Sequence, residues 1–112
     1  SGIARNYIQN IDKKKFILPK LYAKRESSWH LFIIKTKVKN RLKLYNYLKK
    51  KGITSVLHYI PVYMHPYYEK TIKNKKLFIK ANKYFQDALS IPIFPNLTIR
   101  KQKYIIQVLN NF

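Results

Sequence analysis

Residues 28–35 read Ser-Trp-His-Leu-Phe-Ile-Ile-Lys, a compact run of aromatic and β-branched residues that is too short for a buried helix. Such a run predicts a β-strand. Alternation divides its side chains between two faces, with Trp29, Leu31 and Ile33 on one and His30, Phe32 and Ile34 on the other. Because both faces are apolar, we expect both to be covered by other parts of the protein.

The segments on either side of this strand have helical spacing. Residues 3–11 carry apolar side chains one turn apart, which predicts the last turns of a helix. Residues 12–25 form a lysine-rich connector whose short apolar patch, 16–18, stops at a proline. Residues 39–51 again predict a helix, with Leu44, Tyr45 and Leu48 on its apolar side and Leu42 at the margin. Gly52 should end this helix, because glycine adopts the left-handed conformation without strain.

The rest of the chain predicts two further strands and two further helices. Residues 55–60 form an expected strand that ends at a proline. Residues 77–89 have the spacing of an amphipathic helix, and residues 90–94 read as a short edge strand. Thr98 is the expected N-cap of a final helix whose apolar stripe is Ile105, Ile106, Leu109 and Phe112. This order of elements predicts a two-layer α+β domain with about three strands in its sheet and helices packed on it.

Composition sets the class of protein. The 112 residues are enough for one domain, and 46% hydrophobic residues are enough to fold it. The chain has no cysteine, which excludes disulfides and cysteine-based metal sites. It contains no apolar run long enough to span a membrane and no signal-peptide order at its beginning, so we expect a cytoplasmic protein without membrane partners.

The charge is extreme, with 24 basic against 4 acidic residues and a formal net charge of +20. Such a charge suggests a polyanion partner. However, only four of the basic residues are arginines, and the cations are spread along the chain among many Ile, Asn, Tyr and Phe. Compositional drift with a solvated surface explains this pattern too, and so does a larger assembly whose remainder balances the charge.

The sequence lacks the residue patterns that most kinds of active site need. The histidines at 30, 58 and 65 do not have metal-ligand spacing, so no metal site is expected. The four carboxylates are scattered, and glycine stands only at positions 2 and 52, which excludes a glycine-rich phosphate loop. Residues 58–68 gather His58, Tyr59, His65 and further tyrosines after the expected strand. Imidazoles and hydroxyls placed this way suit a sugar or phosphate ligand, although aromatic packing would give the same pattern.

Four blocks of the sequence resemble one known family. They are Ser-Ser-Trp-His-Leu-Phe at 27–32, Gly-Ile at 52–53, His-Tyr-Ile-Pro-Val at 58–62 with Pro-Tyr-Tyr at 66–68, and Ala-Leu-Ser-Ile-Pro-Ile-Phe-Pro-Asn-Leu-Thr at 88–98. In order and spacing they are similar to the C-terminal domain of the DegT/DnrJ/EryC1/StrS family of PLP-dependent sugar-nucleotide aminotransferases. The His-Tyr-Ile-Pro block is most similar to the branch that aminates UDP-4-keto-6-deoxy-altrosamine on the way to pseudaminic acid.

This resemblance implies the small domain of a type I, aspartate-aminotransferase-like PLP fold. Residues 1–26 would be the end of a linker helix and a connector, and residues 27–112 the small C-terminal domain. The large domain, which carries the catalytic lysine and the other PLP-binding residues in this family, would lie outside the chain. The whole protein would be a homodimer that transfers an amino group, from glutamate, to a keto nucleotide sugar for surface-glycan biosynthesis. This chain alone would be inactive and would bind no PLP covalently.

The resemblance also implies substrate contacts, at Ser28, His30, His58 and Tyr59, and no catalytic residue in this chain. One departure is that Ala-Asn stands at 81–82 where the family commonly has Ala-Glu, which puts a salt bridge there in doubt. Two alternatives from other classes remain. A small basic nucleic-acid-binding module fits the charge and the interleaved tyrosines, but no DNA- or RNA-binding motif supports it. A remnant without activity fits the missing machinery.

Overall fold

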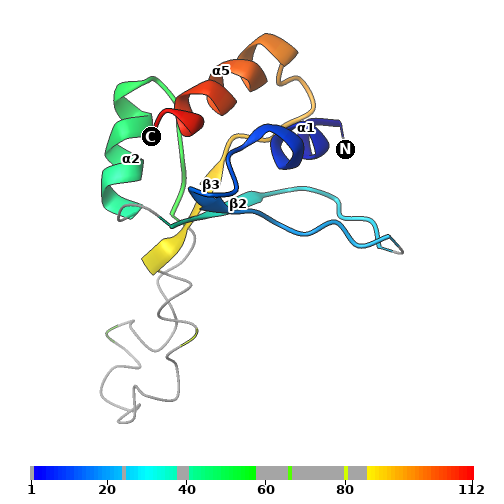
Figure 1. Cartoon of the computed structure of the whole chain (residues 1–112), viewed down its shortest axis with the longest axis horizontal. Coiled ribbons are helices and arrows are strands. Elements are labelled where there is room, and N and C mark those ends of the chain that lie inside the picture. Colours follow the sequence, from blue (N-terminus) through cyan, green and yellow to red (C-terminus); the bar gives the residue numbers. More distant parts are fainter. Residues whose placement is uncertain (1, 24, 38–40, 58–65, 67–79, 81–85) are drawn as a thin grey trace.

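The computed structural model describes residues 2–23, 25–37, 41–57, 66, 80 and 86–112. Within these ranges the chain forms three helices and a three-stranded sheet (Figure 1). In chain order the elements are α1 (Gly2–Asn10), β1 (Phe16–Ile17), β2 (Phe32–Thr36), α2 (Arg41–Lys50), β3 (Ala88–Ile91) and α5 (Ile99–Asn110). The predicted α+β fold with about three strands is therefore confirmed.

The sheet is antiparallel throughout, with β2 in its centre. Phe16 of β1 lies opposite Thr36 of β2, and Phe32 of β2 lies opposite Ile91 of β3. Beyond β3, Val56 forms a single antiparallel bridge to Ser90. The central strand therefore includes the C-terminal half of the strand predicted at 28–35.

One face of the sheet is covered by all three helices, which lie on the same side of it in Figure 1. Phe32, Ile34 and Thr36 point to this face and are buried. Tyr7 of α1 meets Phe32 edge to face, with ring centroids 5.1 Å apart. The helices contribute further core residues, Ala4, Leu44, Leu48, Ile105, Ile106, Val108 and Leu109. Burial of these apolar side chains is the main source of stability, at about 25 cal/mol per Å² removed from water.

The ends of α2 and α5 follow the sequence signals. Gly52 has φ +76°, and the Gly52 and Ile53 N–H groups donate to the Lys49 and Leu48 carbonyls, which is a Schellman ending. Thr98 has extended backbone, and its side chain accepts a hydrogen bond from the Lys101 N–H. Both predicted helix boundaries are confirmed, as is α1. Leu42, predicted at the margin of its helix, is 64% exposed. Phe112, predicted as part of the stripe of the last helix, lies just beyond α5 and is half-buried.

The predicted strand at 28–35 is wrong in its first half, since β2 begins at Phe32. Trp29 has φ +50°, a left-handed conformation that an extended strand does not contain. The second correction concerns the faces. Leu31 is 43% exposed and Ile33 is half-buried, so only one face is fully covered by the described residues.

The other strand predictions need correction too. The connector predicted at 12–25 contains β1, because Phe16 and Ile17 pair with the end of β2. The helix predicted at 77–89 ends earlier, since Ala88 and Leu89 are buried in β3 opposite Lys35 and Ile34. The strand predicted at 90–94 is therefore displaced to Ala88–Ile91, and Val56 lies outside it. Of the strand predicted at 55–60, Val56 forms the bridge to Ser90, and residues 58–60 lie outside the described residues, as does most of 77–89.

Residues 18–23 and 25–31, between β1 and β2, belong to a long arm that leaves the body of the molecule (Figure 1). Leu21 and Tyr22 on this arm are more than half exposed. Residues on both sides of position 26 share one core, since Ala4, Tyr7 and Phe16 pack in the same cluster as Phe32. In the part of the chain that the structure describes, no helix has the length and apolar character needed to cross a bilayer.

Candidate functional site

Two of the four predicted site residues, Ser28 and His30, lie in one place. Both line a cavity of about 1020 Å³ between the return of the arm, the N-terminal end of α1 and the segment that leads into α5. Both side chains belong to exposed residues. His58 and Tyr59 lie outside the described residues, so their role stays a prediction.

The backbone around Trp29 sets the positions of Ser28 and His30. The Trp29 N–H donates to the Ser27 hydroxyl at 3.2 Å, and its positive φ turns the chain. The indole packs on Phe32 of β2, with ring centroids 5.7 Å apart. A left-handed non-glycine residue costs about 1 kcal/mol or more and persists only where its surroundings hold it. Here the partly buried ring holds the turn, and the residues on either side of it, Ser28 and His30, line the cavity.

The opposite wall of the cavity comes from distant parts of the sequence. Asn6 of α1 donates to the Gln102 side chain at 2.8 Å, and Gln102 in turn donates to the Leu97 carbonyl. Phe94 is 47% exposed on this wall, and Lys103 of α5 adds an ammonium group. The cavity therefore combines a hydroxyl, an imidazole, an amide, a cation and apolar rings. Such a set can stack against a sugar or base and exchange hydrogen bonds with its hydroxyls.

Nothing in the sequence pattern identified the residues of this wall. Lys103 is one of many lysines, and Asn6 sits in a helix like any surface residue. Phe94 belongs to one of the four blocks that carry the family resemblance, which was the only signal available for it. The wall forms because the bond from the Tyr7 hydroxyl to the Pro92 carbonyl, 2.8 Å, holds α1 beside the end of β3. Burial raises the pKa of Tyr7 above its usual range, so this donor keeps its proton.

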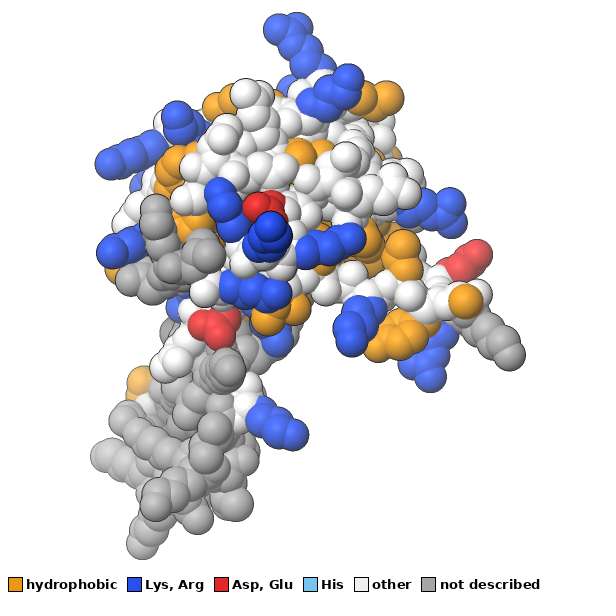
Figure 2. Space-filling model, viewed as in Figure 1, with side chains coloured by type: hydrophobic (Ala, Val, Ile, Leu, Met, Phe, Trp, Pro, Cys, Tyr) orange, Lys and Arg blue, Asp and Glu red, His pale blue; other side chains and the backbone are white. Residues whose placement is uncertain are grey.

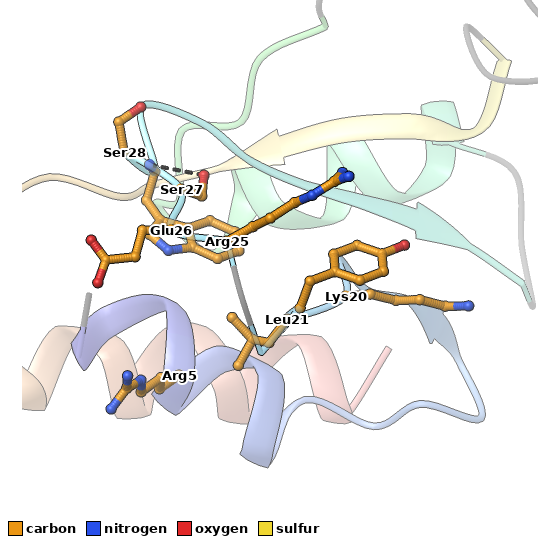
Figure 3. Close-up of a pocket in the computed structure, with 9 residues that line it drawn as sticks. Arg5, Lys20, Leu21, Arg25, Glu26, Ser27 and Ser28 are labelled. Atoms are coloured by element: carbon orange, nitrogen blue, oxygen red, sulfur yellow. Dashed lines mark hydrogen bonds between the residues drawn. The ribbon is translucent and has the colours of Figure 1, made fainter.

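A second cavity, of about 670 Å³, adjoins the first through Ser28 and Trp29. Its lining includes the cations Arg5, Lys20 and Arg25 (Figure 3). In that view the side chains of Lys20 and Arg25 run to the side away from Arg5, and the Glu26 carboxylate lies on the side of Arg5. The Arg25 guanidinium lies 5.9 Å from the Tyr22 ring centroid. These cations do not converge, so this cavity is not a formed phosphate cradle.

On the face of the molecule that Figure 2 shows, the positive charge of the described residues does not gather into one binding surface. Figure 2 shows Lys and Arg side chains at separate places around the described part of the molecule. Arg41 lies partly buried beside Asp87; desolvation lowers its pKa, and attraction to Asp87 opposes that shift. A spread of this kind fits a solvated surface better than a groove for a nucleic-acid backbone.

Known proteins of one family match this chain over nearly its whole length. A family model described as the DegT/DnrJ/EryC1/StrS aminotransferase family matches residues 2–110. The chain is 33% identical over 103 residues to an uncharacterised protein of Methanocaldococcus jannaschii, a match that covers 86% of this chain and 26% of that protein. It is 28% identical over 99 residues to the dTDP-3-amino-3,4,6-trideoxy-alpha-D-glucose transaminase of Streptomyces venezuelae, covering 87% of this chain and 26% of that enzyme.

Solved structures agree. The S. venezuelae DesV structure in complex with a ketimine intermediate superposes with a TM-score of 0.88 at 25% identity, covering 98% of this chain and 30% of that one. Helicobacter pylori PseC, described as an aminotransferase involved in the biosynthesis of pseudoaminic acid, superposes with a TM-score of 0.86 at 24% identity. The match covers 98% of this chain and 30% of that one, and it shows that the two share the fold. The chain thus spans less than a third of the length of these relatives. By the family match over residues 2–110, it belongs to the DegT/DnrJ/EryC1/StrS aminotransferase family.

Proposed function

We propose that this chain is the small, substrate-closing domain of a PLP-dependent aminotransferase that acts on a keto nucleotide sugar. The observation that carries the proposal is the family match over residues 2–110 together with the cavity that Ser28 and His30 line. The S. venezuelae relative is named as a transaminase of a dTDP-linked sugar. We infer that the substrate here is also a nucleotide sugar. Residues 1–26 would be the end of a linker helix and a connector, and residues 27–112 the small domain; α1 and β1 pack into the same core as β2, so the two parts form one folded unit. The large domain would lie in the rest of the protein.

The described residues do not fit PLP as a complete site. The cofactor of such enzymes needs a lysine, an aspartate facing its ring nitrogen and a phosphate cradle. Neither Asp12 nor Asp87 lines the cavities described above, and Asp12 accepts a hydrogen bond from the Lys14 N–H instead. The side chains of Lys15 and Lys37 are engaged by the carbonyls of Asn110 and Lys13. We therefore assign the cofactor and the amino-group chemistry to the large domain.

The contribution of this chain would be to bind, orient and enclose. Ser28 and His30 would exchange hydrogen bonds with the nucleotide sugar, while Trp29 and Phe94 would provide apolar surface. Exclusion of water and alignment of the substrate account for large rate effects without any proton transfer by this domain. His58 and Tyr59 complete the proposed contact set. The similarity of the His-Tyr-Ile-Pro block makes a precursor of pseudaminic acid our specific substrate proposal, with glutamate as amino donor.

The test is reconstitution. The chain would be joined to the PLP-binding part of the S. venezuelae transaminase in place of its own C-terminal quarter, and transamination of nucleotide sugars would be measured. We expect activity from the fusion and none from this chain alone, with or without added PLP. His30→Ala should lower kcat/KM by about ten- to a hundredfold, roughly 1.4–2.8 kcal/mol, with little effect on stability. Protein-bound PLP absorbance in the isolated chain, or an inactive but folded fusion, would contradict the proposal.

The same preparation tests the nucleic-acid alternative. Binding of a DNA or RNA oligonucleotide would be followed while the salt concentration rises from about 50 to 200 mM. A polyanion-binding protein loses about a thousandfold or more in affinity over this range. We expect weak binding throughout, because the cations do not converge.

A further inference from the structure

The face of the sheet opposite the helices is assembled from all three strands and the Val56 bridge. The register places Ile17, Lys35 and Ala88 in one row across this face, and Ile33, Ser90 and Val56 in the next. Leu31, just before β2, continues the surface. We call these residues, together with Leu18, the open face.

The open face is mainly apolar; Ala88 and Ser90 on it are buried, at 8% and 5% exposure, and its accessible part lies around them. Ile17, Leu31 and Val56 are 49%, 43% and 47% exposed. A hollow of about 390 Å³ runs across it, lined by Ile17, Leu18, Pro19, Trp29, Leu31, Ile33 and Lys35. Leu31 and Val56 also line a neighbouring groove of about 580 Å³ beside β3. Contiguous apolar surface of this kind marks a protein interface more often than a solvated surface.

Charge separates the open face from the rest of the surface. The chain carries 24 basic residues, yet among the positions that form the open face only Lys35 is charged. The exposed sides of α2 and α5 carry Lys43, Lys49, Lys50, Arg100 and Lys103. Lys101 of α5 is also exposed, and it lines the groove beside β3. Depletion of charge from the core of a patch, with cations kept elsewhere, is the composition of a protein–protein interface. A chain with a net charge of +20 also repels a second copy of itself, which disfavours self-association as the use of this face.

The open face is continuous with the candidate site. Trp29 lines the hollow on the open face and also the cavity of Ser28 and His30. His30 and Leu31, adjacent in sequence, both line the groove beside β3. A domain seated on the open face would therefore adjoin that cavity. The relatives supply such a domain, because this chain spans only 26–30% of their length.

We propose that the open face is the surface on which the PLP-binding large domain of the aminotransferase docks. The inference rests on the proposed function, and it names the contact surface: Ile17, Leu31, Ile33 and Val56 against apolar side chains of that domain. The helix-bearing side would then face solvent, where its cations belong.

Thiol accessibility tests this assignment, because the chain has no cysteine of its own. Leu31→Cys and Val56→Cys place probes on the open face. Leu42→Cys, at a residue 64% exposed on α2, is the matched control on the helix side. Each variant would be made in the chain alone and in the fusion with the S. venezuelae PLP-binding part, its cysteines replaced, and the rate of reaction with an aromatic disulfide reagent would be measured.

In the fusion we expect thiols at 31 and 56 to react at least about tenfold more slowly than in the chain alone, and the thiol at 42 to react at the same rate. Equal rates in fusion and chain at positions 31 and 56, or equal protection at position 42, would overturn the assignment. The readout does not depend on catalysis. If the thiols are protected but the fusion is inactive, the docking assignment stands and the proposed function is contradicted. If the fusion is active but the thiols are unprotected, the proposed function stands and the docking assignment is contradicted.

Discussion

The two faces of the sheet are built from the same strands and the same kinds of side chain, but they have different surroundings. Ile34 faces the helices and is fully buried, while its neighbour Ile33 faces the open side and is half-buried. Phe16 and Ile17 divide in the same way within β1, at 1% and 49% exposure. An apolar residue on a strand therefore predicts that its side chain will be covered by other protein, but it does not show which polypeptide segment covers it.

This difference separates stability from function in the molecule. The covered face holds the core that the three helices share, so substitutions there should unfold the protein. Side chains on the open face contribute little to that core and instead form much of the exposed apolar surface. Substitutions there should spare the fold and impair whatever docks on it.

The largest expected effect comes from the matched pair at the centre of β2. Ile34→Ala should lower the free energy of unfolding by about 4 kcal/mol, because it opens a cavity in a fully buried site. Ile33→Ala removes the same atoms from the open face and should cost roughly 1 kcal/mol. Urea unfolding followed by circular dichroism measures both.

Equal losses at positions 33 and 34 would show that the open face is covered within this chain in solution. In that case the contrast between the two faces, and the docking proposal with it, would fail.

The next largest effect is expected at Gly52, which ends α2 on the covered side. Its φ of +76° is unfavourable for a residue with a Cβ atom, although that atom would meet nothing within 4 Å. Gly52→Ala should therefore cost about 1–2 kcal/mol through backbone strain alone. Gly52→Asn, which tolerates this conformation better, should cost less. Similar losses for the two variants would mean that strain is not the cause.

The sequence predicted the covered face better than the open one for a physical reason. The helices that cover it carry local signals: the stripe of α5, the N-cap at Thr98 and the stop at Gly52. Each depends on neighbours within a few residues, which a sequence displays directly. The two-residue strand β1 and the displaced strand β3 have no such signal, because they are strands only through pairing with β2.

The candidate site was predictable in part for the same reason. Ser28 and His30 stand in a recognisable block, and the structure brings them to one cavity. The opposite wall, with Asn6, Phe94 and Lys103, depends on α1 lying beside the entry to α5. That juxtaposition spans most of the chain and leaves no local pattern. His58 and Tyr59 remain predictions.

A smaller effect is expected at Thr98, the N-cap of α5. This helix carries the core residues Ile105 and Leu109. Thr98→Ala removes the acceptor for the Lys101 N–H and should cost about 1 kcal/mol. Thr98→Ser keeps the acceptor and should cost a few tenths of a kcal/mol at most. Thermal unfolding of the three proteins measures the difference. A serine variant as unstable as the alanine variant would exclude capping as the role of this residue.

Tyr7→Phe gives the smallest effect at neutral pH and the most specific one at high pH. The variant loses the hydrogen bond to the Pro92 carbonyl that joins α1 to the end of β3, which should cost about 1 kcal/mol. Burial raises the pKa of Tyr7 above its ordinary value near 10, so above about pH 10 the unfolded chain releases a proton that the folded protein retains.

The stabilisation contributed by this hydroxyl is therefore fully present below about pH 10 and is lost as the pH rises further. Phenylalanine has no proton to release, so the difference between the two proteins should shrink above pH 10 and vanish within about one further pH unit. Comparing the pair cancels the titration of the many lysines and other tyrosines. A difference that stays constant to about pH 11.5 would mean that the Tyr7 hydroxyl ionises as readily in the folded protein as in the unfolded chain, and that α1 does not bury it against the covered face.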